Sequence, residues 1–481
     1  MKYGKIILSS LIAFSLLSCK KLLEIEETDL IGGEVALSTV ASCEQGVIGA
    51  YAGIPPEMAI LLNSTFADEV KKSEFYNAGT THEWQYGATD VGLRDNFTAI
   101  DPFYRIVDRA NRVLRALPTA DSIKVGDNTL REKLKGEALF LRAYAHFELV
   151  RFYGGAFDAS KLAMVYQEEP SPTPTTEFAR INMGPYFEKL VADITAAKPL
   201  LPNNITDINR ANRPAAAALQ ARIALYSKNW AAAATAATEF IDATGLGLAS
   251  KANFPGIWTD ANTSEVAFRI IRTATVGTRL GSLWRGVSSS ASNINTVTWQ
   301  PSDKLWNSYD QLNDIRFASY LKNEPLLSAA NRPSRLVNKY AGTAYGTANE
   351  NVANAKIFRT GEMYLIRAEA RAEQGAFTGA NSAESDINTL RAARINGYTN
   401  VAFASKDQAI NAVMDERFKE LPFEGHRFWD LKRRGLPVAR LSTDAPTPTG
   451  TTLPANDHRF LLPIPLVEIQ SNSSMQQNPG Y

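Results

Sequence analysis

The stretch Arg131–Phe152, REKLKGEALFLRAYAHFELVRF, predicts a long helix in the N-terminal half of the chain. Leucines and alanines recur along it at spacings of four and three, which places them on one helical face: Leu134, Ala138, Leu141, Ala145 and Leu149. Gly154 and Gly155 follow and predict where the helix ends.

Two alanine-rich helical hairpins are predicted further along the chain. The first joins helices over 214–227 and 230–243 through the short turn Lys228-Asn229. The second joins helices over 361–373 and 383–394. Both resemble tetratricopeptide units, but they lie about 150 residues apart rather than at the tandem spacing of 34. We therefore expect an all-α fold of tetratricopeptide-like helix pairs, interrupted by insertions.

Two of these insertions are long and rich in aromatic, glycine and threonine residues. Residues 53–100 and 245–355 read as loops, with one strand predicted over 266–271. Residues 440–457 and the proline-rich stretch Pro170–Thr175 read as further connections. Long loops in compact chains are usually functional. We therefore expect a long-loop, aromatic-rich half with little β structure to carry the ligand site.

The N-terminus reads as an export signal. Lys2 and Lys5 precede an apolar stretch that ends in Leu16-Leu17-Ser18-Cys19, which resembles a bacterial lipobox. The apolar stretch is shorter than the about 20 residues needed to span a bilayer. Residues 1–18 are therefore predicted to be a signal peptide, and Cys19 to carry lipid at the start of an acidic tether, 19–35. Ordinary secretion, with Cys19 a chance residue, is the alternative.

Composition excludes some classes of function. The chain is 45% hydrophobic and 21% charged, as in an ordinary globular protein. Loss of residues 1–18 removes two lysines and takes the formal net charge from +1 to −1, so no basic excess indicates nucleic-acid binding. Once Cys19 is lipidated, Cys43 is the lone thiol, which we interpret as a small buried residue.

No enzymatic motif is found. None of the four histidines, His82, His146, His426 and His458, has a second histidine at metal-ligand spacing. His146 is interpreted as a packed residue of its helix. Adjacent acids such as Asp68-Glu69 do not supply two carboxylates facing each other across a sugar bond. We therefore predict no catalytic residue, no cofactor and no metal site; isolated loop carboxylates do not by themselves assign calcium ligands.

One dense segment, Asp415–Gly435, combines opposite charges with bulky aromatics. We interpret it as a clamp on a turn between two helices, rather than as a catalytic cluster or a nucleic-acid patch. The ion pairs are expected among Arg417, Glu420, Glu424, Arg427 and Asp430, with Phe423, Phe428 and Trp429 packed beneath.

This segment also carries a family resemblance. Glu416–Arg433 strongly resembles the signature of the SusD/RagB family. Three further stretches resemble that family in the expected order: Leu141–Gly155, Glu362–Ala370, and the chain end from Pro463 to Tyr481. The resemblance divides the folded chain into an N-terminal SusD-like helical region, 36–245, and a C-terminal RagB/SusD region, 246–481.

The resemblance implies a lipoprotein of the Bacteroidota outer membrane, displayed on the cell surface. Such proteins act as hinged lids over a SusC-like TonB-dependent barrel, to which they deliver a glycan or, in some members, a peptide. No chemical reaction is involved. The expected partners are therefore the barrel, the ligand and, through Cys19, the membrane lipid. A peptide-binding lid, a surface glycan hydrolase and a scaffold without a small ligand remain as alternatives.

Sugar binding needs aromatic faces and a few placed polar groups. The predicted ligand-binding residues come from both long loops: Tyr76, Trp84, Arg94, Asn96, Trp284 and Trp299. Further candidates are Tyr86, Trp306 and Tyr309 among the aromatics and Asp68, Glu69 and Asn77 among the polar residues. Trp306 and Tyr309 have helical spacing and are expected to be a core pair.

Overall fold

The computed structural model describes residues 36–76, 79–171, 176–287, 294 and 296–481. The predicted signal peptide, Cys19 and the tether lie outside these residues, as do Asn77 and part of the proline-rich connection. No helix in the described ranges is long and apolar enough to cross a membrane.

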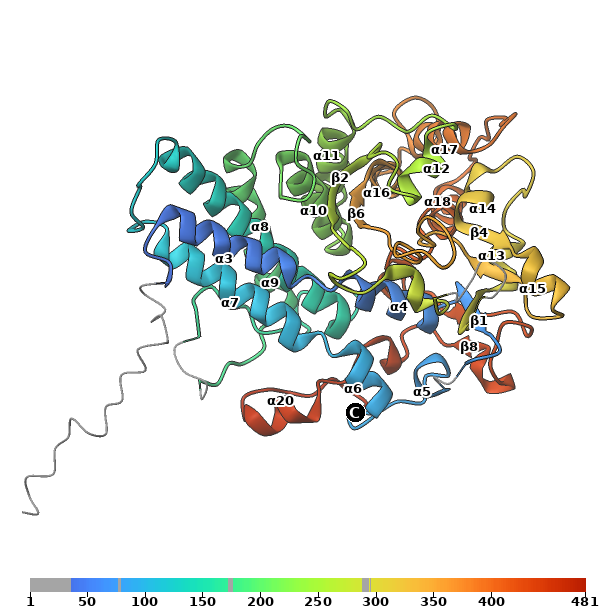
Figure 1. Cartoon of the computed structure of the whole chain (residues 1–481), viewed down its shortest axis with the longest axis horizontal. Helices are drawn as coiled ribbons and strands as arrows, with labels where there is room; N and C mark the ends of the chain where they lie inside the picture. The colour runs from blue at the N-terminus through green and yellow to red at the C-terminus, as the bar shows by residue number, and fades with distance from the viewer. Residues whose placement is uncertain (1–35, 77–78, 172–175, 288–293, 295) are drawn as a thin grey trace, which may run out of the picture.

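The fold is mostly helical, with short strands (Figure 1). Its helices are α3 (Val40–Ala52), α4 (Pro56–Phe66), α5 (Gly79–His82), α6 (Val91–Phe97), α7 (Ile100–Ala116), α8 (Asp127–Tyr153), α9 (Met183–Ala197), α10 (Arg213–Tyr226), α11 (Trp230–Ile241), α12 (Phe254–Trp258), α13 (Asp303–Trp306), α14 (Ile315–Tyr320), α15 (Pro325–Ala329), α16 (Thr360–Glu373), α17 (Ala383–Arg394), α18 (Lys406–Glu420), α19 (Arg427–Arg434) and α20 (Leu466–Ser471). Its strands are β1 (Val70–Lys72), β2 (Val266–Ile270), β3 (Trp299–Pro301), β4 (Leu321–Asn323), β5 (Arg335–Val337), β6 (Ala355–Arg359), β7 (Val438–Ala439) and β8 (Thr452–Leu453).

The helices that the sequence predicted are confirmed as α8, α10, α11, α16 and α17. Local capping explains two of their starting points. The side chain of Asn212 accepts a hydrogen bond from the backbone of Ala215 at the start of α10, and Asn229 does the same for α11. His146 and Cys43 are buried, as predicted.

The two predicted hairpins are neighbours in space. Helices α7, α8, α9, α10, α11 and α16 pack each against the next, and α17 and α18 both pack on α16. Figure 1 shows α10 and α11 in green, between the blue helices at one end and the orange α16 to α18 at the other. The chain leaves the array after α11 and re-enters it at α16, so the insertion interrupts the sequence of the array but not its packing.

In the described residues the strands form four antiparallel two-stranded sheets, two of which join distant parts of the chain. The predicted strand is confirmed as β2, which pairs with β6 immediately before α16. Strand β1, in the first long loop, pairs with β3, in the second. The remaining sheets pair β4 with β5 and β7 with β8.

The interpretation of residues 53–100 as a loop is wrong, because this region contains α4, α5 and α6. Helix α4 starts at Pro56 and has buried side chains over most of its last two turns, so it shows no clear apolar stripe. Helix α6 has only seven residues, too few for a helical period to stand out.

The segment Asp415–Gly435 is structural, but it is clamped mainly to distant elements. Of the predicted internal pairs, Arg417 lies 2.6 Å from Asp430. Glu420 instead meets the guanidinium groups of Arg316, Arg359 and Arg394 at 2.5–3.0 Å. The other partners are equally remote in sequence: Glu424 pairs with Lys339 and Arg359, and Arg427 pairs with Asp68.

Candidate ligand-binding site

The pairing of β1 with β3 assembles the site. Lys72 lies opposite Trp299 in this ladder. The contact continues beyond the strands, because the backbone N–H of Ser73 donates to the carbonyl of Thr298 at 3.1 Å and that of Phe75 to Val297 at 3.3 Å. Tyr76, which follows directly, is thereby brought against Trp299 from the other long insertion.

A cavity of about 280 Å³ opens at this junction, near the lower end of the about 300–1,000 Å³ usual for ligand pockets. Three of the six predicted ligand-binding residues, Tyr76, Asn96 and Trp299, line it together. The full lining is Leu61, Thr65, Tyr76, Thr81, Asn96, Phe97, Ser282, Leu283, Thr298 and Trp299. The rings of Tyr76 and Trp299 meet edge to face, with centroids 5.2 Å apart.

His82 packs behind this aromatic wall, with its ring centroid 4.8 Å from that of Trp299. Its Nδ1 lies 2.6 Å from the carbonyl oxygen of Thr65, so Nδ1 carries the proton and donates it, leaving Nε2 as an acceptor. Burial, followed by the charge of Arg440, holds the pKa of His82 well below its ordinary value. The ring is therefore neutral at physiological pH.

Two polar atoms of this cluster have no hydrogen-bond partner among the described residues. They are Nε2 of His82 and the hydroxyl oxygen of Tyr76, both buried. Burial, followed by the charge of Glu83, raises the pKa of Tyr76 to about 12, so its hydroxyl keeps its proton. The aromatic cluster thus holds unused capacity both to donate and to accept a hydrogen bond.

Two of the predicted ligand-binding residues, Trp84 and Trp284, belong to the core instead. Trp84 is 2% exposed, donates from Nε1 to the carbonyl of Phe66 at 2.9 Å, and has the guanidinium of Arg440 4.1 Å from its ring centroid. Trp284 is fully buried against Phe423. Neither ring offers a stacking face to a ligand, because packing covers it. Tyr86 is buried in the same way, and Trp306 and Tyr309 are confirmed as core residues.

Trp284 nevertheless helps to position the cavity through its backbone. Its carbonyl accepts hydrogen bonds from the backbone N–H groups of Thr298 and Trp299, at 2.9 and 3.1 Å. The hydroxyl of Thr298 donates to the same oxygen at 2.8 Å. A buried tryptophan therefore fixes the segment that carries Trp299, itself only 6% exposed, to the cavity.

The candidate carboxylates are structural as well. Asp68 is buried between Arg427 and Lys304, at 2.8 and 2.6 Å. Burial alone would raise the pKa of Asp68, but these two cations outweigh it and hold the pKa below its ordinary range. Burial raises the pKa of Glu69 to about 7, although its carboxylate accepts hydrogen bonds from Ser64 and from the backbone of Phe423. Neither acid lines the cavity.

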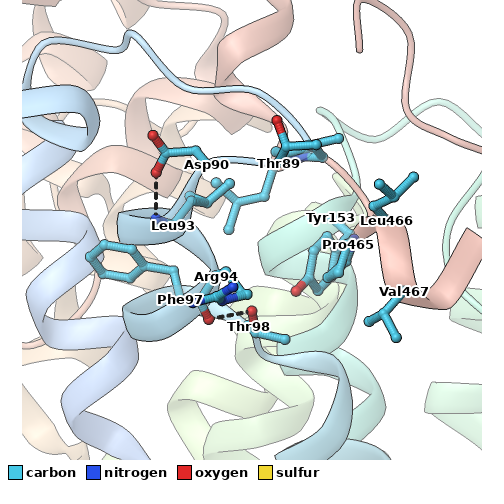
Figure 2. Close-up of a pocket in the computed structure, with 13 residues that line it drawn as sticks. Thr89, Asp90, Leu93, Arg94, Phe97, Thr98, Tyr153, Pro465, Leu466 and Val467 are labelled. Atoms are coloured by element: carbon cyan, nitrogen blue, oxygen red, sulfur yellow. Dashed lines mark hydrogen bonds between the residues drawn. The ribbon is translucent and has the colours of Figure 1, made fainter.

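Arg94 lies on a different cavity of about 240 Å³, drawn in Figure 2. There Leu93, Arg94 and Phe97 of α6 lie across from Tyr153 of α8 and from Leu466 at the start of α20. Phe97 lines both cavities, so α6 separates them. The guanidinium of Arg94 is exposed and pairs with Asp95 at 2.7 Å. The structure therefore does not bring Arg94 together with Tyr76, Asn96 and Trp299.

Most of the residues that line this cavity were not predicted from the sequence. Leu61, Thr65 and Phe97 come from helices in the region interpreted as a loop, and Ser282, Leu283 and Thr298 carry no distinctive motif. A prediction of a helix over Pro56–Phe66 would have been the one local signal that pointed to part of this lining. Among the described residues, no group of three or more histidine, cysteine, aspartate or glutamate side chains is arranged to hold a metal ion.

The packed helical array, with a cavity built from its insertions, places the protein in the class of all-α folds made of packed helix pairs. Comparison with known proteins narrows this class. A model described as "SusD family" matches residues 328–481, and one described as "Starch-binding associating with outer membrane" matches residues 23–225. The chain belongs to the SusD/RagB family.

Full-length relatives agree with this assignment. SusD-like protein P2 of Formosa agariphila is 27% identical, over 97% of each chain. A solved SusD superfamily protein from Bacteroides vulgatus has a TM-score of 0.79 at 23% identity, covering 92% of this chain and 99% of its own. A solved structure named as a laminarin binding SusD-like protein has a TM-score of 0.72 at 20% identity, covering 92% of this chain and 99% of its own.

Proposed function

We propose that this protein is a nutrient-binding lipoprotein of the outer membrane, which captures an oligosaccharide in the cavity between Tyr76 and Trp299 and passes it to a SusC-like TonB-dependent barrel. The observation that carries the proposal is the β1–β3 pairing, which joins two aromatic residues and a neutral polar rim from separate insertions. Aromatic walls pack on the C–H faces of sugars, while hydroxyl and amide groups meet the sugar hydroxyls.

The comparisons support the ligand class and the location in coarse terms. One family model is described as starch-binding and associating with the outer membrane. A relative named starch-binding protein SusD, from Bacteroides thetaiotaomicron, is 34% identical over 26% of this chain and 21% of its own. In the proposal Cys19 carries the lipid, residues 19–35 form the tether, and capture involves no chemical step.

Binding is tested by titrating a panel of hexasaccharides into the purified protein by calorimetry. We expect saturable binding that Trp299→Ala weakens at least tenfold and Asn96→Ala by a smaller factor, because both side chains line the cavity. Arg94→Ala is the matched control, since Arg94 faces the other cavity, and it should leave the affinity unchanged. A melting curve of each variant separates lost binding from lost folding. Binding of peptides in place of saccharides, or equal affinity in all three variants, would overturn the proposed site.

Delivery is tested separately in cells. Cys19→Ala should leave folding and saccharide affinity intact but abolish uptake, because the protein is no longer held beside the barrel. Copurification of the wild-type protein with a TonB-dependent barrel is the expected partner result. Uptake that survives in Cys19→Ala would mean that contact with the barrel, rather than lipid, retains the protein.

A further inference from the structure

We infer that the cavity between Tyr76 and Trp299 selects neutral saccharides and rejects uronic-acid and sulfated ones. The inference rests on the proposed function and adds to it the chemical class of the ligand. Three points support it: the described cavity lining is uncharged, cations of the same half make their hydrogen bonds outside the lining, and burying an unpaired anion is costly.

The lining contains no charged side chain among the described residues. Its polar members are hydroxyl and amide groups, and its apolar members are aliphatic or aromatic.

Three cations of the loop-rich half, Arg440, Lys72 and Arg94, make their hydrogen bonds outside the cavity lining. Arg440, beneath Trp84, donates to five backbone carbonyls: those of Thr65, Phe66, Ala67, His82 and Gly450. The ammonium of Lys72 donates to the carbonyl of Pro446 at 3.0 Å. Arg94 lies on the other cavity and pairs with Asp95. None of these groups lines the cavity, so none is placed to meet a ligand carboxylate.

Charges of both signs act on the aromatic wall. Burial raises the pKa of Tyr76, with Glu83 adding to the rise and Arg440 opposing it. His82 stays neutral because burial and the charges of Arg440 and Lys72 disfavour its protonation. A ligand carboxylate or sulfate would therefore enter a partly desolvated cavity that has no cation in its described lining.

The energetic consequence follows from the cost of burying an anion. An ionised group that leaves water without a partner loses its hydration, and proteins normally recover that loss with arginine or lysine. A sugar hydroxyl loses less hydration free energy than an ion, and hydrogen bonds to groups such as Asn96, Thr65 and Ser282 can offset that loss.

The experiment compares hexasaccharides of equal length that differ in charge: gluco-, manno- and xylo-oligomers against oligogalacturonate, oligomannuronate and sulfated galactan. Calorimetry is run at 20 and 500 mM NaCl with the wild-type protein. We expect at least one neutral hexamer to bind with an affinity that changes less than twofold between the two salt concentrations. The anionic hexamers should bind at least tenfold more weakly than the best neutral one.

A charge-insertion variant tests the cause. Asn96 is exposed at the rim of the cavity, on α6, so Asn96→Lys should fold normally. It should gain salt-sensitive binding of an anionic hexamer, by at least fivefold over wild type at 20 mM NaCl. Asn96→Gln is the neutral control and should show no such gain. Absence of a gain in Asn96→Lys would count against the missing cation as the reason for selectivity.

The outcomes separate the two proposals. A wild-type protein that prefers an anionic hexamer, with loss of that binding in Trp299→Ala, overturns the neutral class and leaves the saccharide site in place. Saccharide binding that is insensitive to Trp299→Ala, or no saccharide binding at all, overturns the site and the ligand class with it. Binding of a neutral hexamer that depends on Trp299 and is insensitive to salt supports both the saccharide site and the neutral class of its ligand.

Discussion

The helical array and the loop-rich half are stabilised in different ways. In α10, Ala215 to Ala218 are all fully buried, and apolar contacts join the helix to α9 and α11. In the loop-rich half, Arg440 donates to five backbone carbonyls. Glu420, at the end of α18, joins the array to this half, because it meets Arg316 and Arg359 as well as Arg394 of α17. A helix satisfies its own backbone, so its faces can be apolar, whereas loops leave backbone groups that need polar partners.

The largest effect that this contrast predicts is at Glu420. Glu420→Ala leaves Arg316, Arg359 and Arg394 buried with less compensation, and should lower the free energy of unfolding by about 3–5 kcal/mol. Urea denaturation measures the loss. Asp101→Asn, which removes an exposed pair with Arg105 on α7, is the control and should change stability by under about 1 kcal/mol. Similar losses in both variants would contradict the role assigned to the buried ion pairs that join the array to the loop-rich half.

The second comparison is between two tryptophans of the loop-rich half. Trp84→Ala removes a buried ring and the hydrogen bond to Phe66, and should destabilise the fold by about 3–5 kcal/mol. Trp84→Phe keeps most of the packing and should cost less. Thermal melting and saccharide titration are measured on the same variants. Substitutions of Trp84 should change mainly the melting temperature, and substitutions of Trp299 should change mainly the saccharide affinity. A fully stable Trp84→Ala protein with weakened binding would restore Trp84 as a ligand platform.

The buried acid Glu69 should make the stability of the loop-rich half depend on pH. Burial raises its folded-state pKa from 4.5 to about 7, so the folded protein binds more protons than the unfolded chain between these values. The stabilising contribution is complete below about pH 4.5 and is lost as pH rises through about 7, a change of up to about 3 kcal/mol. Glu69→Gln mimics the protonated acid. The stability of this variant relative to wild type should therefore increase from pH 4.5 to pH 8; a constant difference would contradict the raised pKa.

The smallest effect concerns packing in the helical array. Ala218 is fully buried in α10, and Ala218→Leu should cost about 1–3 kcal/mol through overpacking. Ala231→Leu is the matched control, because Ala231 is exposed on α11, and it should change stability by under about 0.5 kcal/mol. Equal effects at the two positions would mean that close approach of the helices does not depend on their small residues.

Sequence patterns predicted five helices of the array, but not α7 or α9, and they predicted the site only in part. The helices α8, α10, α11, α16 and α17 repeat their apolar residues over several turns or carry clear caps, which are local properties. The short α6 and the apolar α4 offered no such signal. Of the six predicted ligand-binding residues, Tyr76, Asn96 and Trp299 line one cavity, Trp84 and Trp284 are in the core, and Arg94 lies on another cavity.

The reason is that an aromatic residue has the same local signature whether it is buried or lines a site. Trp84 and Trp299 both follow threonines in loop-like stretches and both are buried, so only their long-range contacts distinguish them. Trp84 is covered by Phe66 and Arg440, and Trp299 is carried to the cavity by pairing with β1. The charges of Asp415–Gly435 likewise predicted a structural segment, although their distant partners could not be read from it.

The amino-acid sequence by itself determined the helical class, the helix pairs and the resemblance to the SusD/RagB family, because periodicity, caps and motifs are encoded within short stretches. Only the tertiary structure decided that the two helix pairs pack as neighbours, that β1 pairs with β3, and that Tyr76, Asn96 and Trp299 share a cavity without charged walls. These features arise where segments more than 100 residues apart exclude water from each other and, in the case of β1 and β3, exchange backbone hydrogen bonds.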